Sequence, residues 1–182
     1  MDIHHGDGGE EVFMYSKKVM TLSLHNYENG FFPGTGGGAE FFKNIGKYFT
    51  TNVPLKNRMN DLTFVNIFKS IFNEIMPKFR PEVIVCQCGA DCLTGDPMGN
   101  FNLTSHGLVC CVEEICSKII PVMFLGGGGY NIPNTTRCWT EIVAAILGKN
   151  LAEDIPDDDY LDIYGPVLNR HSLNLQTIRK RQ

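Results

Sequence analysis

The sequence predicts an α/β fold in which a parallel sheet is flanked by helices. Two short apolar runs, 83–86 and 121–125, have the composition of strands buried on both faces of such a sheet. Helix-forming segments lie between and after these runs, so strand and helix alternate along the chain. With 182 residues and 43% hydrophobic composition, the chain is long enough to form one globular core.

The first half of the chain contains a predicted strand, a long loop and a predicted helix. Residues 19–24 are rich in β-forming side chains and indicate a strand. Residues 26–52 carry many glycines and aromatic side chains, and a loop of this length within a domain is usually functional or mobile. Apolar side chains recur every three or four residues from Asp61 to Met76, which indicates an amphipathic helix, and Pro77 and Pro81 mark its end.

The second half predicts two helices, one after each apolar run. They cover residues 104–118 and 134–148, and the candidate N-caps are Thr104, Asn134 and Thr135. The chain contains no internal repeat and no linker, so residues 1–166 are expected to form one domain. Residues 167–182 lose the hydrophobic pattern and are expected to fray.

Composition and charge exclude some classes of protein. The net charge of −4 argues against a dedicated DNA-binding domain, which is normally basic, so no direct nucleic-acid partner is expected. No apolar run approaches the ~18 residues that span a membrane, so no membrane partner is expected. The seven cysteines, without a signal-peptide pattern, favour a reducing compartment and buried thiols that serve no metal.

Polar clusters are predicted to meet at one edge of the sheet. They comprise residues 2–8, 89–91 after one buried strand, and 126–130 after the other. Ligands of parallel α/β sheets bind at the carboxyl ends of the strands, which is where these clusters fall. This convergence makes the three clusters the candidate functional site.

A metal site is one interpretation of these clusters. Asp2 and His4 are two residues apart, so on an extended segment both side chains point to the same face. Asp91 would add a third ligand, and three protein ligands with an open fourth position are typical of catalytic zinc. The alternative is that Asp2 and His4 belong to a polar turn and that Asp91 caps a helix.

The run of four glycines before Tyr130 also has more than one interpretation. No Lys-Ser/Thr pair follows it, which excludes a P-loop. The glycines could instead deliver the Tyr130 hydroxyl to a developing oxyanion, or simply form a tight turn. Phe31 and Phe32 are candidates for an apolar channel or for ordinary core residues.

Three further polar residues lie in or near these clusters in the sequence. His5 points away from His4, so we expect a buried structural role for it. Asp7 is a candidate for orienting a metal ligand from the second layer, and the alternative is an ordinary turn aspartate. Asp96, between Gly95 and Pro97, is interpreted as a turn former.

The motifs resemble, in the same order, those of class I zinc-dependent histone deacetylases. The matching segments are 2–8, 30–36, 89–91, 95–97, 101–104, 126–131 and 137–140. The resemblance extends over residues 1–166 and implies the three-layer α/β fold that deacetylases share with arginases. It also implies that the N-terminal part of the catalytic domain is missing from this sequence.

The resemblance implies a role for each matching residue. Asp2, His4 and Asp91 correspond to zinc ligands, and Tyr130 to the residue that hydrogen-bonds the acetyl oxygen and stabilises the tetrahedral intermediate. The wall of the acetyl-lysine tunnel corresponds to Phe32, Met98 and Gly128. The family also binds potassium, and the matching positions, besides Asp2 and His4, are Ser23, Leu24, Phe13, Ser16, Val19 and Phe49.

The sequence departs from the family pattern at points that bear on catalysis. The tandem histidines that act as general base and acid lie upstream of the zinc-binding segment in the family and are absent. A family aspartate would fall before Met1, and residues 37–46 replace a glycine-lysine-glycine pattern. Because proton transfer contributes about 10²–10⁴-fold to such reactions, we expect weak or no activity from the chain as written. A truncated gene model or an alternative transcript is the expected origin of this start.

Three functional hypotheses remain open at this stage. The first is a zinc amidohydrolase that acts on acetyl-lysine in histone tails or other proteins, with corepressor proteins as expected partners and the nucleus, and also the cytoplasm, as its expected location. The second is an inactive fragment that binds partners. The third is a relative of the same fold that acts on acetylpolyamines or uses two manganese ions.

Overall fold

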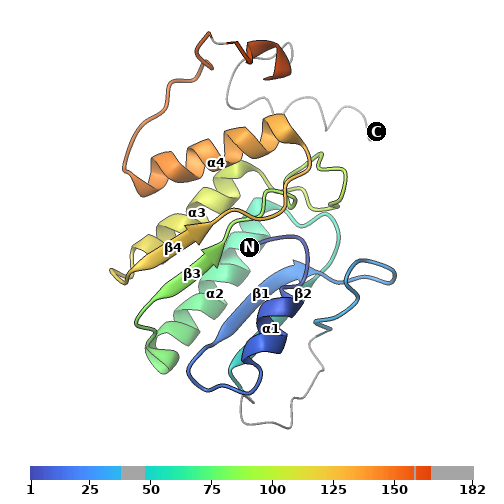
Figure 1. The fold of residues 1–182 in the computed structure, drawn as a ribbon, viewed down its shortest axis with the longest axis vertical. Helices are drawn as coiled ribbons and strands as arrows, with labels where there is room; N and C mark the ends of the chain where they lie inside the picture. The colour runs from blue at the N-terminus through green and yellow to red at the C-terminus, as the bar shows by residue number, and fades with distance from the viewer. Residues whose placement is uncertain (38–47, 158, 165–182) are drawn as a thin grey trace.

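A computed structural model describes residues 1–37, 48–157 and 159–164 of the chain (Figure 1). The elements are α1 (Asp7–Phe13), β1 (Thr21–Asn26), β2 (Thr50–Leu55), α2 (Asp61–Phe79), β3 (Ile84–Gln87), α3 (Ser105–Cys116), β4 (Val122–Leu125), α4 (Ile132–Ile146) and the 3-10 helix η1 (Leu161–Tyr164). The predicted frayed tail, 167–182, and most of the departure at 37–46 lie outside the described residues.

Both strand pairs of the structure are parallel. β1 pairs with β2, with Thr21 opposite Thr50, and β3 pairs with β4, with Ile84 opposite Val122. Helices α2 and α3 pack beside these strands (Figure 1). The predicted α/β class with parallel strands flanked by helices is therefore confirmed.

The N-terminal segment lies between the two strand pairs and connects them. The carbonyl of Met1 accepts a hydrogen bond from the Gly89 amide at 2.7 Å, just after β3. The carbonyl of Ile3 accepts one from the Asn26 amide at 2.8 Å, at the end of β1. Asp2 and His4 are thereby held at the carboxyl ends of β1 and β3, as Figure 1 shows for the chain's N-terminus.

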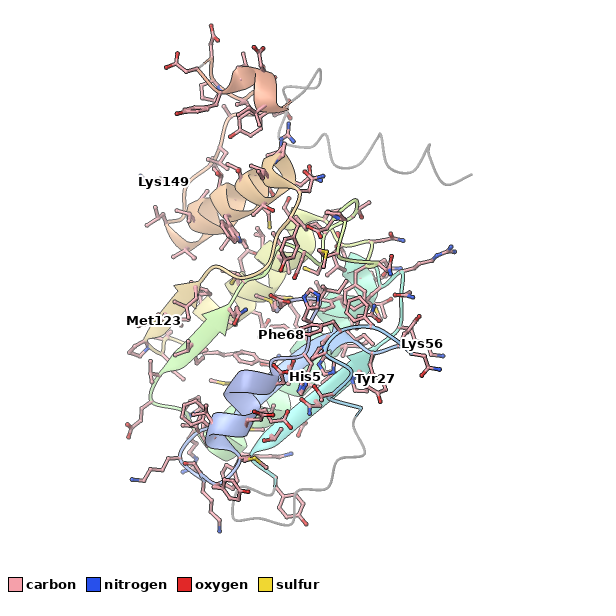
Figure 2. All side chains as sticks on the ribbon, turned by 45° about the vertical axis from the view of Figure 1, so that its right-hand side comes forward. His5, Tyr27, Lys56, Phe68, Met123 and Lys149 are labelled. Atoms are coloured by element: carbon pink, nitrogen blue, oxygen red, sulfur yellow. The ribbon has the colours of Figure 1, made fainter. Side chains whose placement is uncertain are left out.

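The core lies between the strands and the helices. Its fully buried side chains come from different elements: Phe64 from α2, Leu108 and Val112 from α3, and Ile3 from the N-terminal segment. Phe68 of α2 belongs to the same core, whereas Lys56 and Lys149 lie at the periphery (Figure 2). The burial of Ile3, between Asp2 and His4, anchors the segment that carries both polar side chains.

Several element boundaries differ from the sequence-based predictions. α2 continues through Pro77 to Phe79, because a proline in the last turn removes little of the helical hydrogen bonding. α4 begins earlier than predicted, since the Asn131 side chain accepts a hydrogen bond from the Asn134 amide and acts as the N-cap. α1 and β2 were not predicted, because one begins inside a polar motif and the other follows a glycine-rich stretch.

The prediction that β3 and β4 are buried on both faces was wrong. Val85 is 62% exposed, and Met123 and Leu125 are 57% and 46% exposed. These side chains alternate with more buried ones along each strand, so they share one face of the pair. The helices in the described part of the chain cover the opposite face, which contains Cys86 and Phe124.

The cysteines are mostly buried, as expected. Cys86, Cys88, Cys92, Cys111 and Cys138 are buried, whereas Cys110 is half-buried and Cys116 is exposed at the end of α3. Among the helices that the structure describes, none combines the length and apolar character needed to cross a membrane.

A buried polar network links α1, β2 and the loop after β1. The Nε2 atom of His5 lies 2.8 Å from Glu10 and 3.0 Å from the Asn52 side chain, and its Nδ1 atom lies 2.8 Å from the Thr35 hydroxyl. The expected buried structural role of His5 agrees with these contacts. The ring of His25 lies beside it, with centroids 4.6 Å apart.

His25 is fully buried, and its pKa is lowered. Its Nδ1 lies 3.0 Å from the Ser23 hydroxyl, and its Nε2 lies 3.0 Å from the Gly36 carbonyl. Burial is the largest cause of the lowered pKa, and the neighbouring His5 adds to it, while the hydrogen bonds to Gly36 and Ser23 and the charge of Glu10 partly offset both. His25 is therefore held neutral in the folded protein at neutral pH.

The lowered pKa predicts that acid destabilises the fold through His25. Its folded pKa lies below the ordinary value of 6.5, so the unfolded chain binds the extra proton first as the pH falls. The His25 contribution is complete above pH 6.5 and is lost on acidification. Urea unfolding at pH 7.5 and pH 5 should show a smaller loss of unfolding free energy in His25→Gln than in wild type. Equal losses in both proteins would contradict this account.

Candidate metal centre

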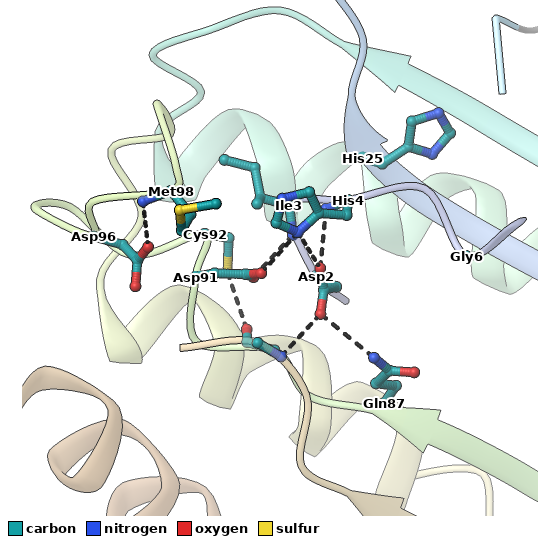
Figure 3. A network of polar contacts seen from close by, with 12 residues as sticks. Asp2, Ile3, His4, Gly6, His25, Gln87, Asp91, Cys92, Asp96 and Met98 are labelled. Atoms are coloured by element: carbon teal, nitrogen blue, oxygen red, sulfur yellow. Dashed lines mark hydrogen bonds and ion pairs between the residues drawn. The ribbon is translucent and has the colours of Figure 1, made fainter. Parts of the chain in front are cut away.

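Three predicted ligand side chains from distant parts of the sequence meet in the structure. Asp2 and His4 come from the N-terminal segment, and Asp91 comes from the loop after β3 (Figure 3). One ligand atom of each lies within 4.8 Å of the others. The Nδ1 atom of His4 is 3.2 Å from Asp2 Oδ1 and 3.0 Å from Asp91 Oδ2. The convergence expected from the strand ends is therefore present.

Backbone amides hold both carboxylates in place. Asp91 is fully buried, and its Oδ1 accepts a hydrogen bond from the Ile3 amide at 3.0 Å. Asp2 Oδ1 accepts one from the His4 amide at 2.9 Å, and its Oδ2 accepts one from the Gly128 amide at 3.2 Å. These contacts leave Asp91 Oδ2 and the imidazole of His4 directed at each other, as the dashed lines in Figure 3 show.

The two carboxylates have opposite pKa shifts. Burial, followed by the charge of Asp2, raises the pKa of Asp91 to about 6. Burial also acts to raise the pKa of Asp2, but hydrogen bonds from the His4 and Gly128 amides and from the Asp91 side chain outweigh it, so that pKa is lowered. Two close carboxylates in a buried place favour a bound cation, which would compensate their combined charge.

Glycines make room for the site. An added Cβ at Gly128 would lie 2.0 Å from Asp91 Oδ2, and one at Gly89 would lie 2.3 Å from Asp2 Oδ2. The Ala90 amide donates to the Gly128 carbonyl at 2.7 Å, so the loops after β3 and β4 are in direct contact. Glycine at 89 and 128 is thus required by close approach to the carboxylates.

Two aromatic rings border the imidazole of His4. The ring of Phe31 stacks on it at 5.4 Å between centroids, and the ring of Phe32 meets it edge-on at 6.0 Å. Phe32 is 74% exposed, which leaves its ring available at the rim of the site. The two residues therefore give the site an apolar wall on the side of His4.

Asp96 connects the backbones of Tyr130 and Met98, a role that its local sequence does not indicate. Asp96 Oδ2 accepts a hydrogen bond from the Tyr130 amide at 2.7 Å, and Oδ1 accepts one from the Met98 amide at 2.8 Å. The interpretation of Asp96 as a turn former was therefore incomplete. The local Gly-Asp-Pro pattern explains a turn, and only the fold brings Tyr130 to it.

The remaining predicted residues lie around this centre without joining it. In the described part of the chain, Asp7 accepts its side-chain hydrogen bond from the Gly8 amide, and no hydrogen bond connects Asp7 or His5 to the three ligands. Ser23 accepts a hydrogen bond from the Gly6 amide, which follows the ligand segment. Leu24 is buried next to it.

The second set of family-implied potassium residues lies farther from the ligands, around α1 and the starts of β1 and β2. The Phe13 carbonyl accepts a hydrogen bond from the Ser16 amide, and the Phe49 carbonyl accepts one from the Thr21 amide. Val19 lies between Ser16 and β1. Their arrangement provides backbone carbonyl groups, and the coordination of an ion there stays a prediction.

The ligand chemistry fits a divalent metal ion. Two carboxylate oxygens and one imidazole nitrogen form a set that zinc accepts in catalytic sites. Asp2 and His4 are only partly buried, so solvent reaches the site. These three residues are therefore the ones that could hold the ion.

Comparison with known proteins finds similarity to histone deacetylases. The model of the histone deacetylase domain matches residues 1–146. The chain is 44% identical to histone deacetylase 8 of Xenopus tropicalis over 166 residues, which is 91% of this chain and 45% of that protein. It is 43% identical to histone deacetylase 1 of Homo sapiens and 44% identical to type-1 histone deacetylase 1 of Dictyostelium discoideum, over 94% of this chain.

The chain spans about half or less of the length of these relatives, 45%, 35% and 34% respectively. The domain match nevertheless covers most of the 182 residues, including all three ligand positions and Tyr130. With the site geometry, this match establishes that the chain belongs to the histone deacetylase family.

Proposed function

We propose that this chain carries the metal-binding half of a zinc-dependent protein deacetylase, which hydrolyses the N-acetyl-lysine amide in histone tails or other proteins. The observation that carries the proposal is the meeting of Asp2, His4 and Asp91 within 4.8 Å, beside the loop that bears Tyr130. The proposed setting is chromatin regulation in the nucleus, with the cytoplasm as a second location and corepressor proteins as partners.

In the proposed reaction, each described residue has a distinct task. Asp2, His4 and Asp91 would hold zinc, which supplies polarisation of a carbonyl and activation of water. Tyr130 follows the glycine run that contacts Asp91, so its hydroxyl is the candidate donor to the acetyl oxygen as negative charge develops there. Phe32 and Met98 border the entrance, where the apolar stem of lysine would lie.

A structural potassium ion is also part of the proposal. Ser23 and Leu24 lie at the end of β1, next to the segment that contains the zinc ligands. An ion bound by carbonyl groups there would neutralise part of the carboxylate charge. The more distant set around Phe13 and Phe49 would support α1 and the starts of the strands.

A binding module is the second candidate function, and a specific observation favours it. His4 and His5 are adjacent in this sequence, but His5 is committed to Glu10 and Asn52. His106, on α3, is exposed and lies next to Cys110. His25 contacts Ser23 and the Gly36 carbonyl. Within the described residues, therefore, no histidine besides His4 has a hydrogen bond to Asp2 or Asp91. A chain without a general base would bind zinc and acetyl-lysine but hydrolyse the amide slowly.

Zinc affinity tests the metal centre directly. Competition with a chromophoric chelator should give one zinc per chain, and Asp91→Ala should weaken binding by more than about 100-fold, since the loss of a mere supporting residue already costs about 10- to 100-fold. Asp154→Ala is the matched control, because Asp154 is an exposed aspartate that follows α4 in sequence and is not one of the proposed ligands. Equal affinities of wild type and Asp91→Ala would refute the proposed ligand set.

Hydrolysis tests the role of Tyr130. Single-turnover release of acetate from an acetyl-lysine peptide should fall about 10²–10³-fold in Tyr130→Phe, which removes only the proposed oxyanion donor. Zinc affinity should not change in this variant. Zinc and peptide binding without any acetate release in wild type would support the binding module instead.

The close approach of Gly128 predicts a severe effect of one methyl group. Gly128→Ala would place Cβ against Asp91 Oδ2, so the carboxylate must move and zinc affinity should fall at least tenfold. Gly8→Ala is the control, because an added Cβ there meets nothing within 4 Å. The chelator competition used for Asp91→Ala measures both, and unchanged zinc affinity in Gly128→Ala would show that the loop can yield.

A further inference from the structure

We propose that Asp96 is a positioning residue for Tyr130, through which the loop after β3 fixes the location of the oxyanion donor on the loop after β4. The inference rests on the proposed function, because positioning matters only if the Tyr130 hydroxyl acts on a substrate. Its physical basis, the attachment of one loop to the other, stands independently of any activity.

In the described residues, the Asp96 side chain accepts its hydrogen bonds from backbone amides of the loop that contains it and of the start of α4. Oδ2 accepts hydrogen bonds from the Tyr130 amide at 2.7 Å and the Asn131 amide at 3.3 Å. Oδ1 accepts one from the Met98 amide at 2.8 Å (Figure 3). A single side chain thus sets the backbone position of both the candidate donor and a residue of the tunnel wall.

The environment of Asp96 makes these hydrogen bonds strong. Asp96 is only 5% exposed, so water does not compete well for hydrogen bonds to its carboxylate. Among the described residues it forms no ion pair, and the three amides are its hydrogen-bond donors. Hydrogen bonds to an ionised carboxylate are about twice as strong as neutral ones. The loss of this acceptor would leave three part-buried amides without this partner.

The position of Asp96 at the N-terminus of α4 further stabilises its contact with Tyr130. Asn131 is the N-cap of α4, and Asp96 accepts from its amide and from the amide before it. A negative charge at a helix N-terminus is stabilised by the helix dipole. The Asn131 side chain also donates to the Gly95 carbonyl at 3.4 Å. The start of α4 is therefore attached to the 95–96 turn from both sides.

The attachment explains how a run of glycines can present a tyrosine at a defined place. Gly126–Gly129 supply little conformational restriction of their own, and Gly129 has a φ of +144°. The run is fixed at Gly128 by Asp2 and Ala90, and at Tyr130 by Asp96. The side chain of Tyr130 is about half exposed, so packing holds it only partly. Its backbone tether then determines where the hydroxyl can reach.

Amide hydrogen exchange tests the attachment of the Tyr130 and Asn131 amides to Asp96, here called the tether, and it requires no enzymatic activity. In ¹⁵N-labelled protein, Asp96→Ala should accelerate exchange of the Tyr130 and Asn131 amides at least tenfold. Asp96→Asn, which keeps one acceptor oxygen, should give a smaller acceleration and serves if the alanine variant does not fold. Asp61→Ala is the matched control, since Asp61 accepts from the Thr104 amide at the start of α3. Unchanged exchange at 130 and 131, or equal acceleration in the control, would overturn the tether.

A double-mutant cycle tests the catalytic consequence. Misplacement of a reacting group by about 1 Å can cost about 10²-fold, so Asp96→Asn should lower kcat about 10- to 100-fold with little change in zinc affinity. In the Tyr130→Phe background the same substitution should change kcat less than twofold, since no hydroxyl remains to be positioned. A purely structural role would lower kcat equally in both backgrounds and would overturn the proposal. If wild type releases no acetate, the proposed hydrolysis fails, and amide exchange still decides the tether.

Discussion

The hydrogen bond from the Ile3 amide to the buried Asp91 carboxylate is the contact on which the rest of the site depends. It connects the segment that holds Asp2 and His4 to the loop after β3, 88 residues away in sequence. Ile3 itself is fully buried, so the apolar core and the carboxylate fix the same residue from its two sides. With Ile3 in place, its two neighbours Asp2 and His4 are held beside Asp91, and one ligand atom of each lies within 4.8 Å of the others. Hydrophobic burial and metal-site geometry are therefore determined by one short piece of chain.

The carboxylates of this centre need hydrogen-bond donors, and backbone amides supply them. Asp2, Asp91 and Asp96 are acidic residues in places with little water, and each accepts hydrogen bonds from main-chain N–H groups. Such donors lower the energy of a carboxylate without adding a competing side-chain cation. They also order the loops that supply them, because each loop must adopt the shape that satisfies the carboxylate. Glycines at 89 and 128 then allow the loops to come close enough.

The sequence predicted most of the helices and strands correctly, but it predicted only some of the contacts between residues distant in sequence. The amphipathic pattern located α2, and the two apolar runs located β3 and β4, since periodicity depends only on neighbouring residues. The proximity of Asp2, His4 and Asp91 followed from strand-end reasoning and from the family motifs, and their role as metal ligands stays a prediction. β2 was missed because its residues follow a glycine-rich stretch, and the contact of Asp96 with Tyr130 joins residues 34 apart. Neither feature has a signature in local composition.

The exposed face of β3 and β4 shows where local reasoning overreaches. Apolar runs such as 83–86 indicate strands that can be buried on both faces, but burial also requires an element that covers each face. In the described chain, Val85 and Met123 lie opposite each other on the uncovered face. The chain spans 45% of the length of histone deacetylase 8 of Xenopus tropicalis and 35% of histone deacetylase 1 of Homo sapiens. A strand's composition therefore records the environment for which it is suited. The proposed metal ligands, by contrast, are held by backbone amides and by Ile3, through contacts already present within these 182 residues.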